Sequence, residues 1–117
     1  MRFCYAFRRF SDYPYLGVAT DLDPSKLTSK FLIRVEKMGF DGIELGMECL
    51  DRIEGGENGL KELEKRLSGL GTPVLAIRSG GRWGGSIIDP KTGKENIKKA
   101  RRALKFGKIL KSEVING

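Results

Sequence analysis

Short apolar runs alternate along the chain with longer segments in which apolar residues recur every three or four positions. The longer segments are typical of helices with one buried face, and they span residues 24–38, 59–70 and 92–111. Each short run follows a helix stop and is typical of a strand buried in a parallel sheet: residues 41–45, 73–77 and 113–116. Strands that alternate with helices in this way predict an α/β fold built from βα units.

The first predicted helix has residues at both ends that favour its boundaries. Asp23 is a suitable N-cap, Pro24 suits the first helical position, and Gly39 suits the left-handed position that follows a helix. Its predicted apolar face consists of Leu27, Phe31, Val35 and Met38. These signals together predict one continuous helix.

The second and third helices carry boundary signals of their own. Asn58 is expected to cap the second helix, and Gly71 and Pro73 end it. Thr92 and Glu95 fit a capping box at the start of the third helix, in which a hydroxyl and a carboxylate each bond an unpaired amide. The predicted inner face of the third helix consists of Ile97, Ala100, Leu104 and Leu110.

A further strand is needed before the first helix, and two segments compete for it, residues 2–7 and 15–19. We favour residues 2–7, which leaves a long loop over residues 8–23. The aromatic rings in and beside this loop can form a lid or an apolar wall over a small ligand, can pack against the rest of the fold, or can await a missing part; the segment contains Phe7, Arg8, Arg9, Phe10, Tyr13 and Tyr15. The prediction is thus four parallel strands and three helices, with both edges of the sheet unpaired.

Composition narrows the possible chemistry. The 117 residues include no histidine, so catalytic triads and histidine metal sites cannot be built from this chain alone. No run is apolar enough to cross a bilayer, and the first residues lack the apolar core of a signal peptide. Cys4 and Cys49 lie far apart and form no C-x-x-C pair, so we expect reduced thiols in a cytoplasmic protein.

The formal net charge of +7 raises the question of nucleic-acid binding. Much of the positive charge falls on and just before the third predicted helix, on Lys91, Lys94, Lys98, Lys99, Arg101, Arg102, Lys105, Lys108 and Lys111. Phe106 is the one aromatic residue there, whereas nucleic-acid surfaces combine basic residues with aromatic ones. We therefore interpret these cations as a solvated helix face rather than a nucleic-acid site.

Three passages at matching spacing resemble a known family. They are FLIRVEKMGFDGIELG (31–46), LKELEKRLSGLGTPVLAI (60–77) and DPKTGKENIKKARRALKFGKILKSEVING (89–117). Together they are similar to the first half of the sugar isomerase/epimerase superfamily with the xylose-isomerase-like TIM barrel, whose other branch contains endonuclease IV-type AP endonucleases. Ser112 departs from the pattern, because the family is expected to have glycine before the fourth strand.

The resemblance implies that residues 1–117 form the N-terminal half of a (β/α)8 barrel, since a whole barrel needs about 250 residues. It implies a divalent metal (Mn, Mg, Co or Zn) in the complete barrel, with catalytic carboxylates in the other half and no metal bound by this chain alone. Expected partners are a sugar or sugar phosphate and either the missing C-terminal half or a second copy. The alternatives are a non-catalytic half-barrel that associates with itself or another chain, and an endonuclease-type nucleic-acid-binding fragment.

In such barrels the functional face lies at the C-terminal strand ends, where five residues are candidates for substrate binding. Glu44 is a carboxylate in an apolar strand, so it needs a polar partner or faces a pocket. Arg78 and Arg82 can hold phosphate or carboxylate, and Trp83 can stack on a sugar, unless they belong to a solvated loop. Asn116 ends the fourth strand and can bond a substrate hydroxyl or a neighbouring loop.

Overall fold

The computed structural model describes residues 1–6, 23–79 and 90–116. Its four strands form one parallel sheet in the order β1-β2-β3-β4, so β1 and β4 are the edges. The strands are β1 (Cys4–Ala6), β2 (Gly42–Gly46), β3 (Val74–Arg78) and β4 (Val114–Asn116). This confirms the α/β fold with four parallel strands and is consistent with half of an eight-stranded barrel. It also confirms residues 2–7 as the source of the first strand.

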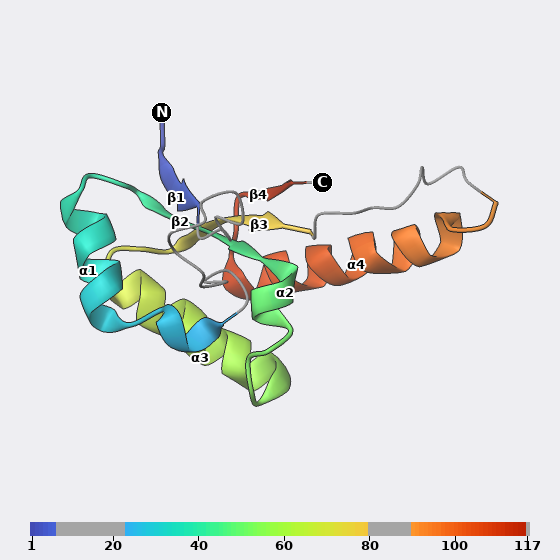
Figure 1. Ribbon diagram of the computed structural model, residues 1–117, viewed down its shortest axis with the longest axis horizontal. Helices are drawn as coiled ribbons and strands as arrows, with labels where there is room; N and C mark the ends of the chain where they lie inside the picture. Colours follow the sequence, from blue (N-terminus) through green and yellow to red (C-terminus); the bar gives the residue numbers. More distant parts are fainter. Residues whose placement is uncertain (7–22, 80–89, 117) are drawn as a thin grey trace, which may run out of the picture.

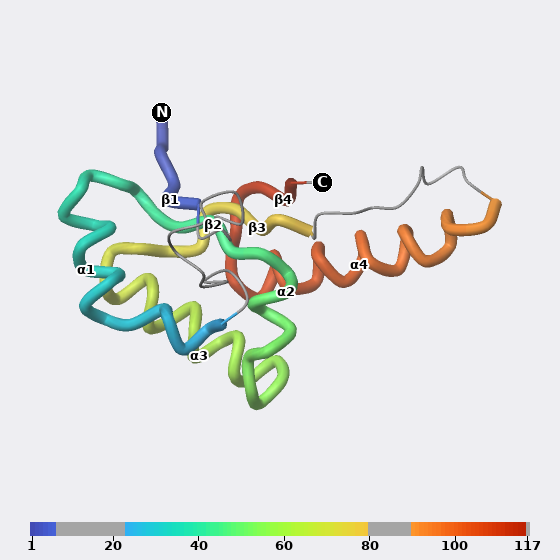
Figure 2. Tube along the Cα trace, in the orientation of Figure 1, coloured from blue at the N-terminus to red at the C-terminus, as the bar shows by residue number. Residues whose placement is uncertain are grey.

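The helices lie on one side of this sheet. Figure 1 shows α1, α3 and α4 below the strands, and the tube in Figure 2 follows the same course. The described elements are a 3-10 helix, η2 (Pro24–Lys26), followed by α1 (Ser29–Lys37), α2 (Met47–Leu50), α3 (Gly56–Gly69) and α4 (Gly93–Leu110). None of these helices covers the other face of the sheet, which we call the open face.

One hydrophobic core fills the space between the helices and the sheet. The strands contribute Ile43, Leu45 and Ile77, each with no exposed surface. The helices contribute Leu32 of α1, Leu60, Leu63 and Leu67 of α3, and Ala103 and Leu110 of α4. Full burial of a leucine or isoleucine side chain contributes roughly 1.5–3 kcal/mol, so this layer is the main source of stability.

The prediction of one continuous first helix is wrong. Asp23 caps only the 3-10 helix, where its carboxylate accepts a hydrogen bond from the Ser25 amide at 2.9 Å. Thr28 then has an extended backbone and caps α1, because its hydroxyl accepts from the Phe31 amide at 3.2 Å. A threonine side chain competes with the helix for backbone hydrogen bonds, which explains the break. Gly39 has the predicted left-handed conformation, with φ +90°.

Other helix boundaries also differ from the prediction. Gly55, not Asn58, is the N-cap of α3, and it has φ +87°. Thr92 is the N-cap of α4 but makes no side-chain cap hydrogen bond, so the capping box is wrong. Glu95 instead pairs with Lys98 at 3.1 Å. The single-turn helix α2 was not expected, because it lacks cap residues and follows its strand directly.

The inner face of α4 was predicted incorrectly in part. Leu110 is buried, but Ile97 and Leu104 are 37% and 61% exposed, and the buried side is formed by Gly93, Asn96, Ala103, Gly107 and Leu110. The cause is close packing: a Cβ on Gly107 would lie 2.7 Å from Ile115 Cδ1 of β4. Small residues therefore face the sheet, and the larger aliphatic ones are displaced to the flank.

Several cations of α4 form ion pairs with neighbouring acidic residues. Arg102 binds Asp51 after α2, Lys105 binds Glu57 of α3 at 2.8 Å, and Lys111 lies 3.7 Å from Glu64 of α3. Most of these charged groups are well exposed, so each pair contributes little to stability. The basic residues of α4 thus partly serve to attach it to the helix layer. Among the described helices, none has the length and apolar composition needed to cross a membrane.

Candidate functional site at the strand ends

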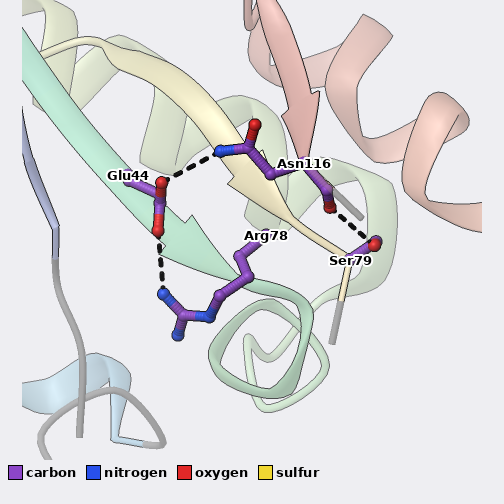
Figure 3. Close-up of polar contacts among 4 residues, drawn as sticks. All are labelled: Glu44, Arg78, Ser79 and Asn116. Carbon is purple, nitrogen blue, oxygen red and sulfur yellow. Dashed lines mark hydrogen bonds and ion pairs between the residues drawn. The ribbon is translucent and has the colours of Figure 1, made fainter. Parts of the chain in front are cut away.

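Three polar side chains meet on the open face of the sheet, at the C-terminal ends of β2, β3 and β4. Ile43 and Leu45 point into the core under the helices, so Glu44 between them points to the open face. Arg78 is paired in register with Asn116 at the ends of β3 and β4. Figure 3 shows that the side chains of Arg78 and Asn116 converge on the Glu44 carboxylate.

The Glu44 carboxylate accepts a hydrogen bond at each of its two oxygens. Arg78 Nη1 donates to Oε1 at 3.0 Å, and Asn116 Nδ2 donates to Oε2 at 3.1 Å. The Glu44 and Arg78 side chains are 7% and 18% exposed. A carboxylate this deeply buried requires such partners, because burial of an unpaired charge is very unfavourable. We call Glu44, Arg78 and Asn116 the strand-end cluster.

Ser79 fixes the end of β4 next to this cluster. Its hydroxyl donates to the Asn116 carbonyl oxygen at 2.7 Å, and its amide donates to the same oxygen at 2.9 Å. Both contacts, of which Figure 3 shows that of the hydroxyl, hold the backbone of β4 against the residue that follows β3. The Asn116 amide group is therefore positioned through its main chain as well as by Glu44.

A glycine provides the space in which the Arg78 guanidinium lies. Gly46 is two residues after Glu44 on the same face of β2, and it is paired in register with Arg78. A Cβ on Gly46 would lie 2.7 Å from Arg78 Nη2. Any larger side chain would occupy the place of the guanidinium, so Gly46 is part of the site.

A leucine of β3 covers part of β2 on the open face of the sheet. The register between β2 and β3 shifts at Ile43 and Glu44, which leaves Leu75 as an extra residue on β3. A Cβ on Gly42 would lie 2.5 Å from Leu75 Cγ, so Leu75 packs directly over this glycine. The open face is therefore apolar near the N-terminal ends of β2 and β3 and polar at the strand-end cluster.

This arrangement is suited to binding polar ligands with several oxygens. An arginine side chain has five hydrogen-bond donors, and an asparagine side chain has both donors and an acceptor. Glu44 is nearly inaccessible, so its role is to orient Arg78 and Asn116. Arg78 and Asn116 are the groups that can contact a ligand hydroxyl or phosphate.

A divalent metal does not fit the described residues. In the ranges 1–6, 23–79 and 90–116, no three cysteine, aspartate or glutamate side chains gather closely enough to hold a metal ion. Glu44 is the carboxylate at the strand-end cluster, and both its oxygens accept hydrogen bonds from Arg78 and Asn116. No chemical step through a metal is therefore derived from these residues.

The structure brings together three of the five residues predicted from the sequence. Glu44, Arg78 and Asn116 form one cluster, whereas Arg82 and Trp83 lie outside the described residues, as does the ring-rich segment before residue 23. Sequence reasoning missed Gly46 and Ser79. The spacing of Gly46 from Glu44, two residues along a strand, was the signal that could have identified it.

Comparison with known proteins adds no family to this picture. No family model matches the chain, and no curated protein or solved structure is significantly similar to it. The assignment to the sugar isomerase/epimerase superfamily therefore stays a prediction from sequence.

Proposed function

We propose that this chain is the N-terminal half of a metal-dependent sugar or sugar-phosphate isomerase/epimerase and forms one wall of its substrate pocket. The single observation that carries the proposal is the strand-end cluster on the open face of the sheet. The C-terminal strand ends are where barrels of this kind bind their ligands. Ligand binding at the strand ends is inferred by analogy with complete barrels, and the strand-end cluster provides the polar groups in this chain that can bind a ligand.

In this proposal the described residues bind and orient the substrate but do not catalyse the reaction. Arg78 donates to a substrate hydroxyl or phosphate oxygen, and Asn116 bonds a neighbouring hydroxyl. Glu44 holds both groups in position. The divalent metal and the catalytic carboxylates belong to the other half of the barrel. The proposed compartment is the cytoplasm, which agrees with the presence of Cys4 and Cys49 as thiols.

The direct test is ligand titration of the whole 117-residue chain, followed by the amide signals of isotope-labelled protein in NMR spectra. The ligands are a pentose, a hexose, a hexose phosphate and inorganic phosphate. We expect saturable shifts at Gly46, Arg78 and Asn116, and their loss in Arg78→Met. Arg34→Met is the matched control, because Arg34 is an exposed residue of α1 on the helix side. Shifts that are equal in both variants, or absent in the natural chain, would contradict the proposal.

A second function is favoured by a different observation. Both edges of the sheet are formed by short strands, and exposed apolar side chains gather near them, including Val114 of β4 at 49% exposure. Exposed edges and apolar surface are typical of sites that associate. The second candidate is therefore a non-catalytic half-barrel that completes its sheet by association. Its test is the oligomeric state of the chain.

A further inference from the structure

Large apolar side chains are exposed only on the outer elements of the described fold. Seven such residues lie at β1, α1, α4 and β4: Met1, Phe3, Ile33, Met38, Ile97, Leu104 and Val114. The inner elements β2, α2, α3 and β3 contribute none to this set. Most surface leucines need no explanation, but this separation places the apolar surface at the two ends of the layer.

The exposed flank of α4 is the side that faces away from α3. Ile97 and Leu104 are seven residues apart, which is almost two helical turns, so they lie on one line along α4. Arg102 and Lys105 point to the other side, where they bind Asp51 and Glu57. The line of Ile97 and Leu104 is therefore on the side of β4, which is an edge strand of the described sheet.

Two oppositely charged residues mark the edges of the sheet. Arg2 precedes β1 and Glu113 precedes β4, and the two side chains form an ion pair with each other. The order of the sheet puts these residues at the N-terminal ends of its two opposite edge strands. If β4 of one chain paired in parallel with β1 of a second chain, Glu113 of the first and Arg2 of the second would lie side by side at the N-terminal end of the two paired strands.

We propose that the partner at these edges is a second copy of the chain, with β4 of each copy paired in parallel with β1 of the other. A twofold axis relates the copies, and the two identical joints close a barrel of eight parallel strands. The two edges suit each other because both strands run in the same direction, both have their helices on the same side, and their end charges are opposite. This inference rests on the second proposed function and is independent of sugar binding.

Closure by a second copy would change the candidate site. The open face of each copy becomes part of one barrel interior, and both strand-end clusters lie at the same end of that barrel. Leu104 and Ile97 of one copy are then covered by the β1 and α1 region of the other, where Phe3 and Met38 are 59% and 58% exposed. Apolar surface at the two ends of one chain is thus buried in two equivalent joints.

The first measurement is the mass in solution, by sedimentation velocity over a dilution series. We expect a species of twice the chain mass of 13.0 kDa that dissociates on dilution. A folded monomer at every concentration, or an open-ended series of larger oligomers, would overturn the proposal. Sugar binding by a monomer would support the first proposed function and refute the dimer. A dimer that binds no sugar would support the dimer and refute the first proposed function.

The decisive experiment exchanges the charges between two separate chains. In Arg2→Glu both edge positions are negative, and in Glu113→Arg both are positive, so in each variant alone the two positions have the same charge, both within the chain and at each joint. We expect each variant alone to dimerise at least about tenfold more weakly than the natural chain, because like charges are brought together. In an equal mixture, each joint of a mixed dimer regains one positive and one negative group.

Recovery of the dimer in the mixture is the expected result, since no contact within either chain can produce it. No recovery, with both variants folded by circular dichroism, would overturn the proposal. Lys65→Glu and Glu62→Arg are matched controls on the exposed side of α3, and they should leave the dimer unchanged alone and mixed. If the charge variants fail to fold, Val114→Lys provides a second test: a lysine on the edge should give a monomer, and a persistent dimer would refute the joint.

Discussion

The guanidinium of Arg78 lies over Gly46, at the place that any side chain on Gly46 would occupy. The distance from a Cβ at this position to Arg78 Nη2 would be 2.7 Å, and Arg78 Nη1 binds the Glu44 carboxylate at 3.0 Å. The ion pair between Glu44 and Arg78 therefore depends on the absence of a side chain at Gly46.

Gly46→Ala should displace the guanidinium and weaken its bond to Glu44. The arginine end can move, so the backbone is not expected to shift, but a buried carboxylate then loses a partner, at a cost of about 1–3 kcal/mol. Urea unfolding measures this loss. Gly69→Ala in α3 is the matched control, because a Cβ there meets nothing within 4 Å and should stabilise the helix by up to about 1 kcal/mol. Equal stability changes of one sign in both variants would contradict the role of Gly46.

The ion pair of Glu44 and Arg78 should show strong coupling in a double-mutant cycle. Arg78→Met leaves the buried carboxylate without its cationic partner, and we expect a loss of about 3 kcal/mol in the free energy of unfolding. Glu44→Gln combined with Arg78→Met should recover part of that loss, because the uncompensated charge is gone. Additive effects of the two substitutions would show that these groups do not interact.

Two threonines at helix starts should respond differently to replacement by alanine. Thr28 caps α1 with its hydroxyl, so Thr28→Ala should cost about 1 kcal/mol. Thr92 makes no side-chain cap bond, and among the described residues its buried hydroxyl has no hydrogen-bond partner, so Thr92→Ala should cost far less. Thermal unfolding of both variants provides the comparison. A larger loss for Thr92→Ala would restore the capping box that the sequence predicted.

Acid should weaken the contact between α3 and α4. The hydrogen bond and the charge of Lys105 lower the pKa of Glu57. A carboxyl whose pKa is lower in the folded state stabilises the protein above its unfolded pKa of about 4.3, and this contribution is lost as the pH falls through the folded pKa. Glu57→Gln should therefore be less stable than the natural chain at neutral pH, and the difference should vanish in acid. A difference that is the same at both pH values would exclude this explanation.

The four strands and the three longer helices α1, α3 and α4, with their order along the chain, follow from local patterns in the sequence. Apolar runs and glycine stops located all four strands to within one or two residues, because strand and helix periods follow from local backbone geometry. It also located Glu44, Arg78 and Asn116 at strand ends, where parallel strands bring polar residues together. Helix starts were predicted less well: Asp23 caps only η2 while Thr28 caps α1, and Gly55 instead of Asn58 is the N-cap of α3.

Which side chains meet, and which face of α4 is buried, depends on the packing of the elements against one another. Ile97 and Leu104 have the correct period for a core face, but the close approach of Gly107 to Ile115 turns small residues to the sheet instead. In the same way, the contact of Glu44 with Arg78 joins residues 34 positions apart and depends on the space above Gly46. Such contacts depend on how closely the helices and strands pack, and this distance cannot be predicted from a local pattern of residues along the chain.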